Sequence, residues 1–183
     1  MSEIEASCLK KFGVWLQELP EDARLMAKLT LHGQVDESSR RRLVSALNYL
    51  FKSVDLIPDG IEDLGYMDDA FVLRVTASLV GTERAELLDL DSTGVLRRLA
   101  ADAELVEGFL EADYARALRF VKGLGSIEAR GRSVDAIVAE ASVLEQFVDE
   151  VESWSKTFES PAFKQDERNL IRLRAFLQTK LPS

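Results

Sequence analysis

Residues 55–69 read DLIPDGIEDLGYMDD and join two strongly apolar segments of the chain. Pro58 fixes its own φ, has no N–H group and disfavours the α conformation at Ile57, so a helix that arrives from the N-terminal side must end before it. Gly60 and Gly65 then allow tight turning. We therefore expect an acidic turn between two helices.

The turn also contains apolar side chains, which a loop surrounded by water has little reason to carry. They are Leu56, Ile57, Ile61, Leu64 and Tyr66. We expect them to hold the turn on a hydrophobic core and to leave the carboxylates at the rim. Asp68 and Asp69 directly precede the apolar run 70–80, where negative charge stabilises a helix N-terminus, and Asp68 is a candidate cap for the free amides there.

The chain before the turn shows helical periodicity. Apolar residues at spacings of three and four predict a helix that begins near Ile4 and ends at Pro20, followed by a shorter helix over residues 21–32. Asp36 is a good N-cap for a third helix, which runs to about Ser53 and leads into the turn.

The chain after the turn opens with residues 68–80, which are apolar nearly all round, and this is typical of a helix buried at the centre of its domain. Two long amphipathic helices follow, over about 92–123 and 133–158, joined by a connection that contains three glycines. This arrangement predicts an antiparallel hairpin. Pro161 then begins a final helix.

These patterns predict an all-α protein: a compact multi-helix domain with a long C-terminal helical hairpin and a final helix. A chain of 183 residues with 46% hydrophobic content is long enough to bury one substantial core or two small ones. We divide it into a helical domain over residues 1–90 and a helical extension over 91–183. The extension needs a partner for its apolar stripes, which is the N-terminal half, the last helix or another subunit.

Composition excludes several classes of protein. The net charge of −9 and a pI near 4.8 argue against nucleic acid as the main partner. Cys8 is the only cysteine and His32 the only histidine, which excludes an internal disulfide framework, most zinc sites and most Ser-His or Cys-His machinery. We expect Cys8 to be a buried, unreactive thiol.

The N-terminal sequence MSEIEASCLKK has neither a basic n-region nor an apolar h-region, so we expect a cytoplasmic protein. No apolar run reaches the length of a membrane span, since Arg74 interrupts the best candidate at residues 70–80. Any membrane contact is therefore expected to be peripheral.

The turn resembles a known family signature. The run D-x-I-P-D followed by G-Y-x-D-D is similar to the signature of the small bacterial YkvA-like domain of unknown function. In this chain it is carried, within a region of about residues 36–80, by Asp55, Ile57, Pro58, Asp59, Gly65, Tyr66, Asp68 and Asp69. Glu62 stands where members usually have a second proline. The resemblance implies a short helical domain, often found near membrane segments, and it implies no reaction.

The acidic turn is also a candidate metal site, because hard cations such as Mg²⁺ and Ca²⁺ require several oxygen ligands. The candidate ligands are Asp55, Asp59, Asp63, Asp68 and Asp69. The EF-hand pattern fails, since Ile57 and Tyr66 occupy its third and twelfth positions, where oxygen ligands are needed. In the alternative interpretation these carboxylates cap helices and pair with arginines of neighbouring helices.

Two further patterns have two interpretations each. The pairs Glu104 with Glu107 and Glu145 with Asp149 share helical faces, which suits a Mg²⁺ site for phosphoester hydrolysis but also any solvated acidic helix. Arg40, Arg41 and Arg42 form either a solvated first helical turn or a contact with an anion or an anionic lipid surface.

We therefore favour a non-enzymatic interaction or regulatory module that contacts a protein partner, or a second copy of itself, through its C-terminal helices. The alternative is a divalent-metal site in the acidic turn, either structural or supporting phosphoester hydrolysis.

Overall fold

The computed structural model describes residues 1–52, 55–80 and 90–183. In these ranges the chain is helical apart from short connections and one small antiparallel pair of strands, β1 (Glu128–Ala129) and β2 (Arg132–Ser133). The helices are α1 (Glu3–Thr30), α2 (Glu37–Tyr49), α3 (Met67–Val80), α4 (Leu90–Leu110), α5 (Tyr114–Gly123), α6 (Val134–Ala139), α7 (Ala141–Thr157) and α8 (Glu167–Lys180). The predicted all-α fold is confirmed.

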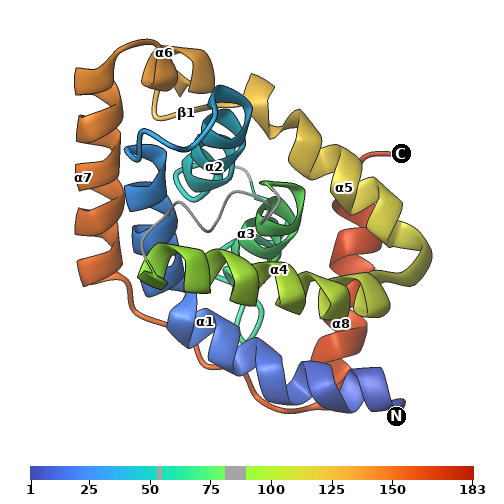
Figure 1. Cartoon of the computed structure of the whole chain (residues 1–183). Coiled ribbons are helices and arrows are strands. Elements are labelled where there is room, and N and C mark those ends of the chain that lie inside the picture. Colours follow the sequence, from blue (N-terminus) through green and yellow to red (C-terminus); the bar gives the residue numbers. More distant parts are fainter. Residues whose placement is uncertain (53–54, 81–89) are drawn as a thin grey trace.

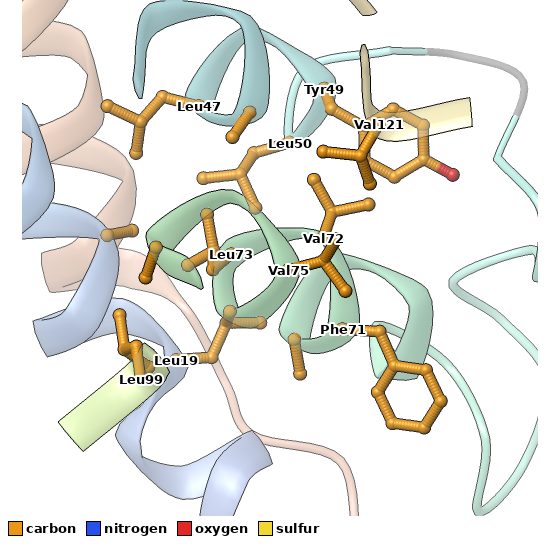
Figure 2. Packing of buried hydrophobic residues seen from close by; sticks show 14 of the residues in the cluster. Leu19, Leu47, Tyr49, Leu50, Phe71, Val72, Leu73, Val75, Leu99 and Val121 are labelled. Carbon is orange, nitrogen blue, oxygen red and sulfur yellow. The ribbon is translucent and has the colours of Figure 1, made fainter. Parts of the chain in front are cut away.

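Helix α3 lies at the centre of the fold, and α1, α2, α4 and α5 pack around it (Figure 1). Figure 2 shows side chains of α3, among them Leu73 and Val75, between Leu47 of α2 and Leu19 of α1. The prediction that residues 68–80 form the core helix is confirmed. Because the acidic turn leads directly into α3, the core fixes one end of the turn.

Helix α1 runs without interruption through Pro20, so the prediction of two helices that meet there is wrong. A proline inside a helix removes one backbone hydrogen bond and costs about 3 kcal/mol. Buried residues on both sides of Pro20, such as Phe12 and Met26, belong to the same hydrophobic core. Their burial offsets the local cost, since tertiary packing supplies most of the stability of a helix in a protein.

The long helix predicted over residues 92–123 is broken into α4, a 3₁₀ turn called η2 (Glu111–Asp113) and α5. Glu111 has a φ of 51°, a left-handed conformation that cannot continue an α-helix. Helix α7 packs on α1, on the other side of the fold from α5 (Figure 1). The predicted hairpin is therefore not formed, because the apolar stripe of α7 is covered by the N-terminal helix.

Helix α8 begins after the N-cap Asp166, later in the chain than Pro161 had predicted. The irregular segment 158–166 precedes it, and Phe163 in this segment packs edge-on against Phe12 of α1 with 5.9 Å between the ring centroids. Helix α2 begins as predicted, since the Asp36 side chain accepts a hydrogen bond from the Ser39 N–H.

One hydrophobic cluster contains buried residues from both halves of the chain, including Leu16, Leu47, Leu73, Phe109, Phe147 and Leu173. The division at residue 90 stays a prediction. None of the helices in the described ranges is both long and apolar enough to cross a bilayer.

Candidate functional site

Asp68 lies in the first turn of α3, and its carboxylate joins α3 to α2 and to the acidic turn. Its Oδ2 accepts a hydrogen bond from the Tyr49 hydroxyl at 2.6 Å and another from the Ile57 N–H at 3.1 Å. The Tyr49 hydroxyl accepts in turn from the Leu56 N–H at 2.9 Å. Since α3 already begins at Met67, Asp68 is not the helix cap that the sequence suggested.

In the hydrogen bond between Tyr49 and Asp68, the proton belongs to the tyrosine. Burial and the nearby Asp68 carboxylate both raise the pKa of Tyr49, so its hydroxyl stays protonated and acts as the donor. Burial raises the pKa of Asp68 to about 6, although the hydrogen bonds from Tyr49 and Ile57 act in the opposite direction. At neutral pH this link is therefore a charge-assisted hydrogen bond in the interior of the protein.

The backbone of the turn folds tightly around Gly65. A Cβ at this position would lie 2.0 Å from the carbonyl oxygen of Asp59, so only glycine fits. Asp63 and Tyr66 have positive φ values of 67° and 64°, which are unfavourable for residues other than glycine. Gly60, by contrast, has open space where a Cβ would stand. Of the two glycines singled out in the sequence, Gly65 is the one with a steric requirement.

The apolar residues hold the turn on the core, as predicted. Ile57 and Leu64 are fully buried, whereas Pro58, which directly follows Ile57, is exposed. Tyr66 packs edge-on against Phe158, with 4.9 Å between the ring centroids. The hydrophobic core and the segment 158–166 therefore both hold the turn in place.

The five predicted metal ligands do not form one group. Asp63 pairs with Lys164 at 3.5 Å, and the same lysine pairs with Glu62 at 3.1 Å. Asp69 is buried beside Asp68 in α3. In the part of the chain that the structure describes, no three Asp, Glu, His or Cys side chains are arranged to hold a metal ion.

The remaining carboxylates interact unfavourably with one another. Burial raises the pKa of Asp55 to about 7, and the charges of Asp68 and Asp59 add to this effect. Burial likewise raises the pKa of Asp69 well above its ordinary value, with contributions from Asp68, Asp55 and Asp59. Asp59 is exposed, but partial desolvation still raises its pKa, while a hydrogen bond from Tyr66 lowers it. The corner therefore concentrates negative charge that opposes folding at neutral pH.

A buried ion cluster on another side of α3 was missed in the sequence. Arg74 is fully buried, and its guanidinium lies 3.6 Å from the carboxylates of Asp22 in α1 and Asp102 in α4. It also lies over the ring of Trp15, 4.1 Å from the centroid, and donates to the Ala70 carbonyl at 3.0 Å. The sequence feature that could have indicated this cluster is the single arginine within an apolar helix, because a buried arginine requires acidic partners.

The cluster extends to the surface through two further cations. Arg98 pairs with Asp22 and, at 2.8 Å, with Glu18, and Lys11 pairs with Asp102 at 3.1 Å. Desolvation lowers the pKa of Arg74 to about 10, so the group remains charged at neutral pH. This network joins α1, α3 and α4.

The three consecutive arginines have different environments. Arg40 donates to three carbonyl oxygens at and after the end of α1, at 2.8 to 3.2 Å, and so closes that helix. Arg41 pairs with Asp135 of α6. Arg42 lines a surface hollow. The predicted anion contact therefore cannot use all three arginines alike.

Cys8, His32 and the two acidic pairs lie in different parts of the described structure. Cys8 is buried, as predicted, and burial raises the pKa of its thiol to about 12. His32 accepts a hydrogen bond from the Gln34 N–H at 3.3 Å, just after α1. The acidic pairs at 104 and 107 and at 145 and 149 lie on exposed faces of α4 and α7, which each pack on α1.

Comparison with known proteins gives a match over part of the chain. The family described as "Protein of unknown function (DUF1232)" matches residues 40–74. This is a family without an assigned function. The matched span covers most of α2, the acidic turn and the first half of α3, which are the elements joined by Asp68. The YkvA-like name suggested by the signature is not confirmed, and no curated protein or solved structure gives a significant match.

Proposed function

We propose that this chain is a non-enzymatic interaction or regulatory module. The observation that supports this most strongly is the structural use of Asp68, whose buried carboxylate already accepts hydrogen bonds from Tyr49 and Ile57. A carboxylate engaged in this way is poorly placed to take a proton from a substrate. On this proposal the signature residues set the position of α2 relative to α3.

The contact surface that we propose is the outer face of α8. Ile171 is 61% exposed there. Arg172, Ala175, Phe176, Thr179 and Lys180 line a shallow hollow of about 320 Å³ on the same helix. An exposed apolar side chain beside cationic groups suits an acidic, partly apolar counterpart.

A second copy of the chain offers a suitable counterpart. Glu145 and Asp149 are exposed on α7, one helical turn apart, and give this helix an acidic outer face. We therefore propose that α8 of one copy contacts α7 of another. Because the two surfaces differ, such a head-to-tail contact allows more than two copies to join.

The test is the mass of the protein in solution, measured by sedimentation or light scattering across a wide range of concentrations. The parent should gain mass as concentration rises, and Ile171→Glu should remain monomeric. Leu31→Glu is the matched control, because Leu31 is 46% exposed just after α1. A parent that stays monomeric throughout, or a Leu31→Glu variant that dissociates equally, would contradict the proposed surface.

Divalent-cation binding at the acidic corner is the second candidate. Its support is the accumulation of like charge at Asp55, Asp59, Asp68 and Asp69, together with Asp68 Oδ1, which is buried without a hydrogen-bond partner among the described residues. The half-buried Asp55 and the exposed Asp59 would have to move inward to supply ligands, and Asp63 would have to leave Lys164.

Thermal unfolding of chelator-treated protein with and without Mg²⁺ or Ca²⁺ tests this candidate. A cation that binds the folded state raises the midpoint in a saturable way. Asp59→Asn should abolish the rise, because it removes one of the proposed ligands. No rise in the parent would exclude the metal site.

The cytoplasmic location remains part of the proposal. So does the exclusion of nucleic acid as main partner, because a net charge of −9 repels a phosphate backbone.

A further inference from the structure

A basic hollow of about 210 Å³ lies between α2 and the end of α5. Its polar and glycine lining consists of Ser38, Arg41, Arg42, Ser45, Lys122 and Gly125. Four of these residues come from α2 at spacings of three and four, so they project from one face of that helix. The other wall is formed by the last turn of α5 and the 3₁₀ turn η3 (Leu124–Ser126).

The two walls approach each other closely. A Cβ added at Gly125 would lie 3.6 Å from Ser45 Oγ, so the turn is in van der Waals reach of α2. The Ser45 hydroxyl donates to the Arg41 carbonyl at 2.6 Å, which leaves Ser38, exposed at the start of α2, as the hydroxyl able to serve a ligand.

Positive charge in the hollow is only partly neutralised. Within the described ranges, Arg42 and Lys122 have no acidic partner. Arg41 has one, Asp135, and the two side chains of this pair are 38% and 73% exposed. Three cations therefore meet one carboxylate that water screens well.

The two helix ends beside the hollow have opposite effects on a bound anion. Ser38 and Arg41 lie in the first turns of α2, whose N-terminal dipole favours an anion. The end of α5 presents carbonyl groups, but Lys122 lies in its last turn and the Ser126 hydroxyl donates to the Gly123 carbonyl at 2.9 Å. The side-chain cations therefore decide the sign of the local potential.

We propose that this hollow binds a phosphate group. Arg42 supplies a planar fork of N–H donors, Lys122 a compact charge and Ser38 a hydroxyl donor, which together match the several oxygens of a phosphate. Arg41 joins when it turns from Asp135 to the ligand. Arg40 is not part of the proposed site, because its guanidinium already donates to carbonyl oxygens at and after the end of α1. The proposal does not depend on self-association through α8.

The phosphate can belong to a soluble phosphoester or to the headgroup of an anionic lipid, and two probes distinguish these sources. Calorimetric titration with pyrophosphate tests the soluble form. Co-sedimentation with phosphatidylcholine vesicles, with and without phosphatidylglycerol, at low and high salt, tests the lipid form. Binding to pyrophosphate alone identifies a soluble ligand, and salt-sensitive binding to the anionic vesicles identifies a lipid headgroup.

Matched variants test the site itself. Arg42→Ala and Lys122→Ala should each weaken binding of the responding probe about five- to tenfold, as expected for the loss of one cation near a phosphate. Asp135→Asn should strengthen it, because Arg41 is released. Arg97→Ala, which removes an exposed arginine of α4, should have no effect. Failure of both probes to bind, or an equal loss in Arg97→Ala and Arg42→Ala, would overturn the proposal.

Discussion

Replacing Asp55 by asparagine should stabilise the protein at alkaline pH and leave its stability in acid unchanged. Burial and the charges of Asp68 and Asp59 raise the pKa of Asp55 from 3.8 to about 7. A carboxyl whose folded-state pKa lies above its unfolded value gives stability that is present at low pH. That stability is lost as the pH rises through the folded-state pKa. Asparagine carries no charge, so it removes this loss.

The magnitude follows from the shift and from the exposure of the side chain. A shift of about three units corresponds to about 4 kcal/mol when it is fully expressed. Asp55 is only partly buried, so solvent screening reduces the expected gain to about 1 to 2 kcal/mol. In a chain of this size, that gain raises the unfolding midpoint by about 2 to 8 °C.

Thermal and urea unfolding at about pH 4 and about pH 8 measure the effect on both sides of the transition. Asp63→Asn is the matched control, because it makes the same chemical change at a carboxylate that pairs with Lys164. This control should show no gain at either pH. An Asp55→Asn variant that is less stable than the parent at about pH 8, or equally stabilised at both pH values, would refute the electrostatic argument.

Three further experiments test other parts of the structure. Gly65→Ala should cost about 3 kcal/mol or more in urea unfolding, because its Cβ meets the Asp59 carbonyl, whereas Gly60→Ala should change stability by less than about 0.5 kcal/mol; equal effects would contradict the turn geometry. Arg74→Met should cost on the order of 3 kcal/mol, since it leaves buried carboxylates without their shared cation. Adding Asp22→Asn should recover part of that loss, and a fully additive double variant would argue against the ion pair. Cys8 should react with a thiol reagent only as fast as the protein unfolds, and rapid labelling of the folded protein would contradict its burial.

The sequence predicted those features whose causes are local. Asp36 caps α2 through its own third neighbour, Ser39, and the apolar run after Asp69 makes α3 a buried helix. Pro58 and Gly65 correctly indicated a turn, because their backbone preferences do not depend on distant residues.

Features that depend on distant residues were not predictable in the same way. Pro20 is tolerated inside α1 because the core buries side chains on both sides of it, and nothing near Pro20 in the sequence reveals that core. Glu111 breaks the predicted long helix although its neighbours follow a helical pattern. Glu62 and Asp63 form ion pairs with Lys164, which is about a hundred residues away in the sequence. In each case tertiary packing decides what local propensity leaves open.

The sequence correctly predicted a turn between two helices at residues 55–66, but it did not reveal the hydrogen bond that joins Asp68 to Tyr49. Six carboxylates within residues 55–69 suggested a cation site, whereas the decisive partner of Asp68 is Tyr49, in the preceding helix. A tyrosine at the end of an apolar helical face is read most simply as a core residue, and its hydroxyl carries no sequence signal of its own.

The central claim is that Asp68 and Tyr49 form a structural link between α3 and α2, and a double-mutant cycle tests it most directly. Tyr49→Phe, Asp68→Asn and the double variant should be compared with the parent by urea unfolding. The structure predicts that the two single costs together exceed the cost of the double variant by about 1 to 2 kcal/mol, because Tyr49→Phe removes the donor of this hydrogen bond and Asp68→Asn removes the negative charge that strengthens it. Costs that add to within about 0.5 kcal/mol would show that the two side chains are not coupled and would reopen Asp68 as a ligand-binding residue.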